Sequence, residues 1–550
     1  MRPRTLGFAL AVASLLALGR AEDASPAPQM PALRARTELV LLPTLVHDKS
    51  GAPVRGLGKS DFTLLENGAE RKIAVFEEVQ TTAVRPRRPS LPAGVFSNYL
   101  VRESAPRRVT IIVMDSINTR FNDKSYARDQ ILKFLGETAA SNEPIALLQL
   151  QRGGVRVIHD FTTDPAVLAK ALRRFTEGAA PQAGSEQEIV DPDVAAETGQ
   201  FGDMMREAEL NFVAFERLFA ARLTLDGMQA IARAYAAIPG RKSLIWASGG
   251  FPFSIDDLTR ALSGGVGAAT SSLFDILPYY EKTWQALNDA NMALYPVDVR
   301  GLVVLGADVS RRSSGSGLQS AYRREAWMHH ETLATFAEFA DMTGGKAYYN
   351  TNDLVHAFRA AVDDSASYYM LGFYLAPDDR KPGWRKLQVK VKQAHVQVRT
   401  RSGFYVLPAE KDKEKSRQSD VQLAMTSPLD FTSLPLLVRW TTTTPQGEMK
   451  RAVFEIILPA NAAVVDESDQ NYMSMDFEAA AREPTGKIVA SHGRTLEAHL
   501  KPESLSQVRS KGITYTGDLD LPPGEYTVRF VVRDNLSGRM GSVGAPLTIP

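Results

Sequence analysis

One apolar run constrains the fold more than any other stretch of this chain. Residues 108–115 read Arg-Val-Thr-Ile-Ile-Val-Met-Asp, so apolar and β-branched side chains continue without alternation up to Asp115. A strand that is apolar at consecutive positions is buried on both faces, as in the parallel sheets of α/β proteins. Residues 122–138 follow with the spacing of an amphipathic helix. The run therefore predicts the first strand–turn–helix unit of an open α/β sheet, with Asp115 at its carboxyl edge, where such sheets bind ligands.

The alternation of strand and helix patterns continues over residues 107–365. Further buried strands are predicted at 144–150, 155–160, 243–247 and 293–298, and helical spacing fills most of the intervals between them. Strands that alternate with helices favour a parallel sheet with helices on both faces. We therefore predict the α/β class for this chain, with a doubly wound, mostly parallel sheet.

On both sides of this region the hydrophobic period changes to two, which is typical of half-buried antiparallel strands. The amino-terminal module, residues 37–80, contains an Asn67-Gly68 turn between two strand patterns, which is a strong hairpin signal. Residues 366–407 and 431–550 alternate in the same way, and the second of these ranges is typical of a separate Ig-like sandwich. We expect β-sandwich modules on both flanks of the α/β domain.

The amino terminus and the composition indicate the cellular context. A basic start, an apolar stretch at residues 6–18 and small residues near Ala21 are typical of a secretory signal peptide. The alternative is a membrane anchor, for which the apolar stretch is short. The chain has 550 residues, no cysteine and a net charge of +1, so we expect several domains, no disulfides and no binding to nucleic acid. The mature protein is expected to be secreted or periplasmic, without a membrane span. The predicted segments are a signal peptide (1–21), linkers (22–36, 81–106 and 408–430) and structured parts (37–80, 107–365, 366–407 and 431–550).

Four short motifs carry a family resemblance. They are Val54-Arg55-Gly56-Leu57 (with Asp61-Phe62 and Glu66-Asn67-Gly68), Met342-Thr343-Gly344-Gly345-Lys346-Ala347, Tyr368-Tyr369-Met370-Leu371-Gly372-Phe373-Tyr374 and Arg401-Ser402-Gly403-Phe404-Tyr405. Over residues 37–406 the chain resembles the bacterial secreted von Willebrand factor type A-related family. The resemblance implies a type A-like α/β domain between β-modules. Because it is continuous while the period switches at each flank, we predict that residues 37–78 and 368–404 form one sandwich into which the α/β domain is inserted.

The segment Asp115-Ser116-Ile117-Asn118-Thr119 lies where type A domains keep a metal-ion-dependent adhesion motif, D-x-S-x-S. The resemblance implies a Mg²⁺ ion with Asp115 and Thr119 among its ligands, because hard cations prefer such oxygens. Ile117 replaces the middle serine, however, and Gly249 replaces the aspartate of the "TDG" segment. One carboxylate and one hydroxyl would leave Mg²⁺ held mostly by water. The alternative, which we favour, is that Asp115 and Thr119 orient the turn through hydrogen bonds.

These features predict an exported, non-enzymatic protein for adhesion, binding or scaffolding, with no cofactor other than the implied Mg²⁺. A protein or cell-surface partner would bind the loops at the carboxyl edge of the sheet, at residues 115–121, 178–202, 248–253 and 301–317. The alternative is a secreted hydrolase with an unrecognised site. Against it, Ala334 stands where H-E-x-x-H needs its second histidine after His330-Glu331, and Trp246 stands at the first glycine of G-x-S-x-G around Ser248.

Overall fold

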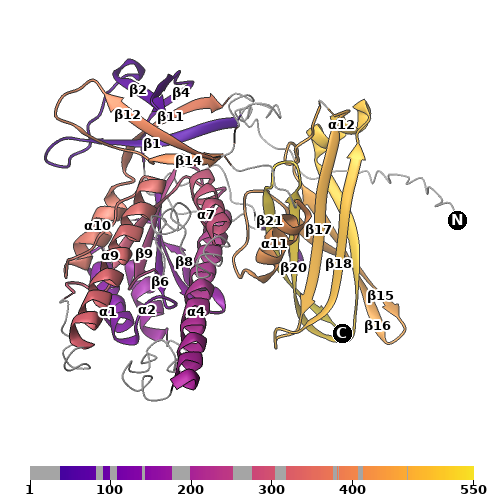
Figure 1. Cartoon of the computed structure of the whole chain (residues 1–550). Helices are drawn as coiled ribbons and strands as arrows, with labels where there is room; N and C mark the ends of the chain where they lie inside the picture. Colours follow the sequence, from indigo (N-terminus) through magenta and orange to yellow (C-terminus); the bar gives the residue numbers. More distant parts are fainter. Residues whose placement is uncertain are drawn as a thin grey trace.

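The computed structural model describes residues 38–81, 91–98, 108–138, 143–175, 199–251, 276–303, 317–375, 381, 383–406, 413–467 and 469–550. In these residues, 21 strands form five sheets, beside eight α-helices (Figure 1). Four of the sheets are antiparallel throughout, and the fifth is mixed. The described chain is therefore mostly β. The predicted α/β class, with a doubly wound, mostly parallel sheet, is wrong.

The mixed sheet has the order β10-β9-β6-β7-β8. Its strands are β6 (Arg108–Asp115), β7 (Ile145–Gln151), β8 (Gly154–Thr162), β9 (Arg241–Ser248) and β10 (Met292–Asp298). The pairs β10–β9, β9–β6 and β6–β7 are parallel, whereas β8 runs antiparallel to β7. The Arg152-Gly153 turn between β7 and β8 explains this departure, because two residues can connect only antiparallel neighbours.

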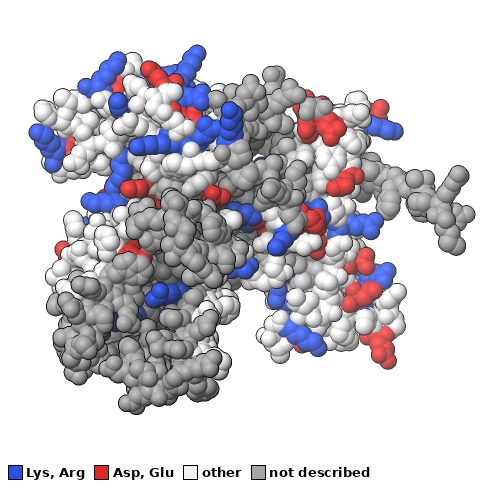
Figure 2. All heavy atoms as spheres, viewed as in Figure 1, with Lys and Arg blue, Asp and Glu red and all other residues white. Residues whose placement is uncertain are grey.

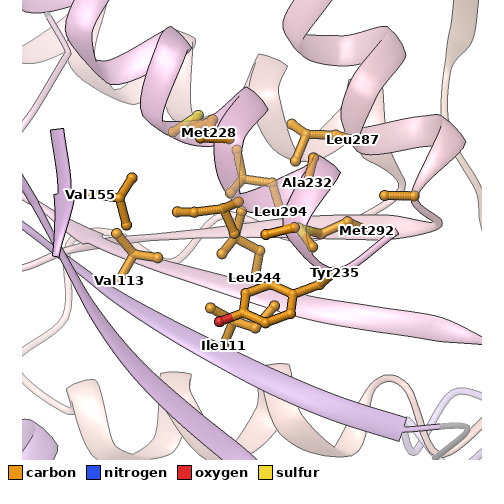
Figure 3. Packing of buried hydrophobic residues seen from close by; sticks show 14 of the residues in the cluster. Ile111, Val113, Val155, Met228, Ala232, Tyr235, Leu244, Leu287, Met292 and Leu294 are labelled. Carbon is orange, nitrogen blue, oxygen red and sulfur yellow. The ribbon is translucent and has the colours of Figure 1, made fainter. Parts of the chain in front are cut away.

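Helices cover both faces of this central sheet. On one face pack α1 (Phe121–Glu137), α2 (Pro165–Arg174) and α10 (Leu354–Asp363), and on the other α4 (Gly199–Ala234), α7 (Leu277–Asp289) and α9 (Gly317–Thr343). Along β6, Ile112 and Met114 pack into the core beneath α1, α2 and α10. Ile111 and Val113 pack into the core on the other face, beneath α4, α7 and α9 (Figure 3). Burial on both faces explains why β6 is apolar at consecutive positions, since each such side chain contributes about 1.5–3 kcal/mol.

One two-sheet unit takes strands from both flanks of the central region (Figure 1). Its sheets have the orders β13-β1-β11-β4 and β14-β12-β2-β3. The elements are β1 (Glu38–His47), a short 3-10 helix (Lys59–Asp61), β2 (Phe62–Glu66), β3 (Ala69–Arg71), β4 (Val75–Gln80), β11 (Ser367–Leu375), β12 (Gly383–Val391), β13 (Gln397–Arg399) and β14 (Gly403–Val406). Val40 of β1 lies opposite Phe373 of β11, and Leu64 of β2 lies opposite Val389 of β12. The contacts that the predicted insertion requires are therefore present.

The carboxyl-terminal sandwich has sheets of the orders β19-β16-β15-β5 and β18-β17-β20-β21. Its elements are β5 (Val95–Ser97), β15 (Leu437–Gln446), β16 (Met449–Leu458), β17 (Tyr472–Arg482), β18 (Ile488–His499), α12 (Pro502–Lys511), β19 (Ile513–Leu521), β20 (Gly524–Asp534) and β21 (Met540–Ile549). β5 comes from the segment 81–106, which the sequence indicates as a linker. Its Phe96 lies opposite Val438 of β15. A strand from far upstream thus completes this sandwich.

Asn98, directly after β5, connects this strand to the carboxyl-terminal sandwich through hydrogen bonds. Its Nδ2 donates to the carbonyl oxygens of Phe431 (2.5 Å) and Leu434 (2.9 Å), and its Oδ1 accepts from the N–H of Leu436 (2.8 Å). The Asn98 side chain is buried. Because three backbone groups of the sandwich depend on one upstream side chain, the sandwich and the segment before β6 are structurally coupled.

A second connection is α11 (Lys413–Thr426), which lies within the predicted charged linker 408–430. Asp420 on α11 accepts from Arg233 of α4 (3.0 Å) and from Arg533 of β20 (3.1 Å). Apolar packing accompanies these ion pairs, because Val531 of β20 belongs to the same core cluster as α4 and α7. The central region and the carboxyl-terminal sandwich are therefore packed against each other.

The surface carries charges of both signs. Figure 2 shows Lys and Arg side chains interspersed with Asp and Glu over the described parts of one face. Together with the net charge of +1, this mixture gives the described part of that face no extended field of one sign. Among the described helices, none is long and apolar enough to cross a membrane.

Candidate functional site

Asp115 ends β6 at the carboxyl edge of the central sheet and is only 2% exposed. Its Oδ1 accepts hydrogen bonds from the backbone N–H groups of Ile117 (2.9 Å) and Asn118 (3.0 Å). A carboxylate that accepts from the N–H two and three residues later folds the chain back into a tight turn. Asp115 therefore sets the direction in which the loop leaves the strand.

The second carboxylate oxygen of Asp115 is also fully engaged. Oδ2 accepts from the Ser248 hydroxyl (2.7 Å), the Trp246 indole N–H (3.1 Å) and the Asn118 amide (2.8 Å). β9 supplies Ser248 and Trp246 because it pairs in parallel with β6, with Met114 opposite Ala247. In total, five donors of the chain converge on this one carboxylate.

Two further bonds extend this network across the edge. The second amide proton of Asn118 goes to Thr224 Oγ1 on α4 (2.8 Å). Thr119 Oγ1 accepts from the N–H of Gly249 (2.9 Å). The loop after β6 is thereby tied to α4 and to the end of β9. Sequence reasoning singled out Asp115 and Thr119 but missed Asn118, Trp246 and Thr224, whose roles depend on strand register and helix placement.

Burial determines the electrostatics of this network. Removal from water raises the pKa of Asp115, while hydrogen bonds from Asn118, Ser248 and Ile117 act in the opposite direction. The groups that stabilise the carboxylate are neutral donors. They orient their positive ends toward it, as a preorganised polar site does.

The residues at this edge do not suit a Mg²⁺ ion. Mg²⁺ needs oxygen ligands with free lone pairs in near-octahedral geometry, but both oxygens of Asp115 already accept two or three hydrogen bonds. Ile117 offers no side-chain ligand. A Cβ at Gly249 would lie 3.1 Å from the Asn118 carbonyl oxygen and 3.2 Å from Thr119 Cα, so a side chain at this position requires the turn after β6 to shift. Nor do the described residues contain any group of three or more Asp, Glu or His side chains that could hold a metal.

A second carboxylate at the same edge, Asp298 at the end of β10, is also engaged within the chain. Its Oδ1 accepts from the backbone N–H (3.0 Å) and Nε (2.9 Å) of Arg300, and its Oδ2 accepts from Nη2 (2.8 Å). Both oxygens of Asp298 are thus held by Arg300. Asp115 and Asp298 therefore both act as hydrogen-bond acceptors within the chain.

Two large apolar side chains are exposed near the carboxyl edge of the central sheet. Phe121, the first residue of α1, is 71% exposed, and Leu302, shortly after β10, is 59% exposed. Asn352 holds the Leu302 segment, since its Oδ1 accepts from the N–H of Leu302 (2.9 Å) and its carbonyl accepts from the Tyr126 hydroxyl (3.1 Å). Phe121 and Leu302 are therefore the apolar side chains at this edge that a partner could contact.

The four loops predicted to bind a partner are described only in part. Residues 115–121 and 248–251 are described, as are 199–202 within α4 and 301–303 after β10. Residues 178–198, 252–253 and 304–316 lie outside the described residues, and Gly317 begins α9. The candidate site comprises only the described parts of these loops.

Comparisons with known proteins add no family. No family model matches the sequence, and no curated protein matches it. The likeness to the type A-related family therefore rests on the short motifs quoted above.

Proposed function

We propose that this chain is an exported, non-enzymatic binding protein that engages a protein or cell-surface ligand at the carboxyl edge of its central sheet. We also propose that the chain is related to the type A-related family and that ligand binding does not require a metal ion. The observation that carries it is the exposure of Phe121 (71%) directly beside a loop whose Asp115 is held by five donors. Aromatic side chains that a partner buries commonly anchor protein interfaces.

Preorganisation supports this interpretation. The hydrogen bonds of Asp115, Asn118 and Thr119 fix the loop before any ligand arrives, so little further conformational entropy is lost on binding. Leu302 is held in a similar way by Asn352. The two apolar side chains are thus presented on rigid supports.

The packing of the described parts supports a scaffolding role. β5 and Asn98 couple the segment before β6 to the carboxyl-terminal sandwich, and Asp420 couples that sandwich to α4. A ligand bound at the central edge is therefore held at a fixed position relative to the sandwich.

A capture experiment tests the proposal. The protein is immobilised, exposed to the cell-surface proteins of its source, and compared with the variants Phe121→Ser and Leu302→Ser. We expect a ligand that the wild type retains equally in EDTA and in Mg²⁺ and that both variants lose. Val157→Ser on β8 is the matched control, because Val157 is an exposed apolar residue away from the edge.

Two outcomes would count against the proposal. Retention of the ligand by both edge variants would move the binding surface elsewhere, and a ligand lost in EDTA would remove the claim of metal independence. For export, the amino terminus of the protein recovered outside the cytoplasm is expected near residue 22.

A further inference from the structure

The outer face of β12 carries a line of exposed lysines. Alternate side chains of a strand point to opposite faces of its sheet, so Leu387 enters the core of the two-sheet unit while Lys386 and Lys390 are exposed. Lys392 directly follows β12, is exposed, and stays in the ladder because its N–H donates to the carbonyl of Asp61 (2.9 Å). We call Lys386, Lys390 and Lys392 the lysine row. At about 3.3 Å per residue, it is about 20 Å long.

The charges of the lysine row are not neutralised within the described part of the chain. None of the three lysines forms an ion pair with a described residue. Strand register supplies uncharged neighbours on the same face, since Lys386 lies opposite Gly403 of β14 and Lys390 lies opposite Thr63 of β2. The row is therefore free to take an anionic partner.

Two carboxylates lie near the lysine row without cancelling it. Asp61, beside Lys392, already accepts from the N–H of Gly58 through Oδ2 (2.7 Å). Glu70 of β3 lies opposite Leu65 of β2, which places it two strand spacings, or about 10 Å, from β12. Over about 8 Å, salt at physiological strength already screens most of such a charge. The face along β12 thus keeps an excess of positive charge.

An exposed aromatic ring lies at one end of the lysine row. Trp384, two residues before Lys386 on the same face of β12, is 36% exposed. Its ring packs on that of Tyr405 of β14, with centroids 5.0 Å apart and planes tilted by 54°. Gly403 leaves the space that the indole fills, because an added Cβ there would lie 2.2 Å from Cζ2. The indole is therefore held in place while part of its surface stays accessible.

We propose that the lysine row and Trp384 bind a linear acidic polysaccharide. Cations in line along one strand suit a linear polymer that repeats its negative charges, and several weak contacts on one chain add up to useful affinity. A lysine ammonium is a point charge that pairs with a carboxylate or a sulfate without a fixed planar geometry. Sugar rings also have an apolar C–H face, and its contact with the indole of Trp384 removes apolar surface from water.

Other polyanions suit this face less well. Proteins that bind single-stranded nucleic acid stack successive bases on several aromatic side chains, and proteins that lie on membranes insert several apolar ones. Among the described residues of the sheet β14-β12-β2-β3, Trp384 is the only large apolar side chain that is exposed. One ring beside a row of charges therefore favours a sugar polymer.

The lysine row lies far from the candidate site at the carboxyl edge. The two-sheet unit contacts the opposite end of the central sheet, where the N–H of Arg241 at the start of β9 donates to the Tyr368 hydroxyl (3.1 Å) (Figure 1). Phe121 and Leu302 take no part in it. The proposal therefore stands or falls independently of the ligand binding proposed above.

Calorimetric titration of the full chain with two matched polymers tests the role of charge. Polygalacturonate is a linear chain of sugar carboxylates, and its methyl ester is the same chain without the charges. We expect polygalacturonate to bind with a Kd at least about tenfold lower than that of the ester, and more weakly as salt is added. Absence of saturable binding, or equal binding of the two polymers, would overturn the proposal.

A triple variant tests the position of the binding surface. Changing Lys386, Lys390 and Lys392 together to Gln should raise the Kd for polygalacturonate at least about tenfold. The control has the same net charge and replaces three exposed lysines of other parts of the chain by Gln, namely Lys133, Lys170 and Lys487. It should bind as the wild type does. An equal loss in both variants would show that only overall charge matters and would contradict the assignment.

A second polymer pair tests the sugar contact. Trp384→Ala should weaken binding of polygalacturonate several-fold but not that of polyglutamate, which has carboxylates and no sugar rings. Tyr374→Ala should change neither, because Tyr374 is an exposed aromatic on the other sheet of the unit. Unchanged binding of polygalacturonate by a Trp384→Ala variant with the Tm of the wild type would remove the indole from the site. If that variant does not fold, Trp384→Phe, which keeps a ring, replaces it with the same expected direction.

Competition distinguishes the sugar polymer from other polyanions. Phosphatidylglycerol vesicles and single-stranded oligo-dT are compared with polygalacturonate at equal concentrations of negative charge. We expect both to displace polygalacturonate only at a several-fold excess. Tighter binding of either probe, lost in the triple lysine variant, would show that a lipid surface or a nucleic acid occupies the row and would overturn the proposal.

Discussion

Ser248 at the end of β9 donates its hydroxyl proton to Asp115 at the end of β6, over 2.7 Å. The bond joins two neighbouring parallel strands at the position of the metal motif that the sequence predicts. The oxygen of Ser248 in turn accepts from the N–H of Gly250 (3.2 Å). The carboxylate of Asp115 thus accepts hydrogen bonds from groups of the chain itself, and these bonds fix the loops at this edge of the sheet.

This arrangement predicts a large effect for Asp115→Asn. An amide has only one acceptor oxygen, so at least two of the five donors around Asp115 lose their acceptor, whichever way the amide is turned. We expect the free energy of unfolding to fall by about 2–5 kcal/mol, measured in urea. Asp129→Asn on α1 is the control, since Asp129 is exposed. A loss no larger than that of the control would show that the network contributes little.

The same geometry predicts the response to metal. Titration of Mg²⁺ or Mn²⁺ should give no saturable heat, because the lone pairs of Asp115 are engaged. Gly249→Asp, which supplies the missing carboxylate, should not create a site and should lower stability by about 1–3 kcal/mol, because its Cβ would lie 3.1 Å from the Asn118 carbonyl. Saturable binding in the wild type that Asp115→Ala abolishes would contradict this account.

The sequence predicts local features of this fold better than its class. The strand at 108–115 is seen as β6, and the Asn67-Gly68 turn joins β2 to β3 with positive φ at both residues (49° and 85°). The class is wrong because the strands outside the central sheet form four antiparallel sheets, so that the described chain is mostly β, and because the central sheet itself is mixed. The Arg152-Gly153 turn was the available signal that β8 is antiparallel.

The residues of the candidate site could also be predicted only in part from the sequence. Asp115 and Thr119 could be selected from their place after a buried strand, and both hydrogen-bond at the edge. Trp246 and Thr224 could not, because they reach Asp115 and Asn118 only through tertiary placement. β5 was missed because three residues are too short for a periodic pattern to emerge.

The coupling through β5 predicts a selective effect for Asn98→Ala. The change leaves two buried carbonyl groups and the N–H of Leu436 without the partner that Asn98 provides. We expect a loss of about 2–4 kcal/mol, with faster amide exchange in β15 before any change in β6. Gln446→Ala, at the exposed far end of β15, should have little effect. An equal acceleration of amide exchange in the sheet of β15 and in the central sheet would instead indicate that the carboxyl-terminal sandwich does not unfold separately.

Lys242 predicts how stability depends on pH. The side chain is buried at the start of β9, and its Nζ donates to the carbonyls of Ile238 (2.5 Å) and Gly240 (3.1 Å). Burial lowers the pKa of Lys242 from 10.5 to about 7. Between these values the unfolded chain binds a proton that the folded protein does not bind. Stability should therefore rise with pH across this window, by a total of about 5 kcal/mol, and the Lys242 contribution should be constant below it.

Urea unfolding between about pH 7.5 and 9.5, below the titration of most tyrosines, measures this slope. Lys242→Met should flatten it, because the unfolded chain then has one proton fewer to gain. Lys390→Met, at an exposed position of β12, should keep the slope of the wild type. If Lys242→Met keeps the same slope, the amine titrates alike in both states, and its burial would have to be relieved by a local opening at the start of β9.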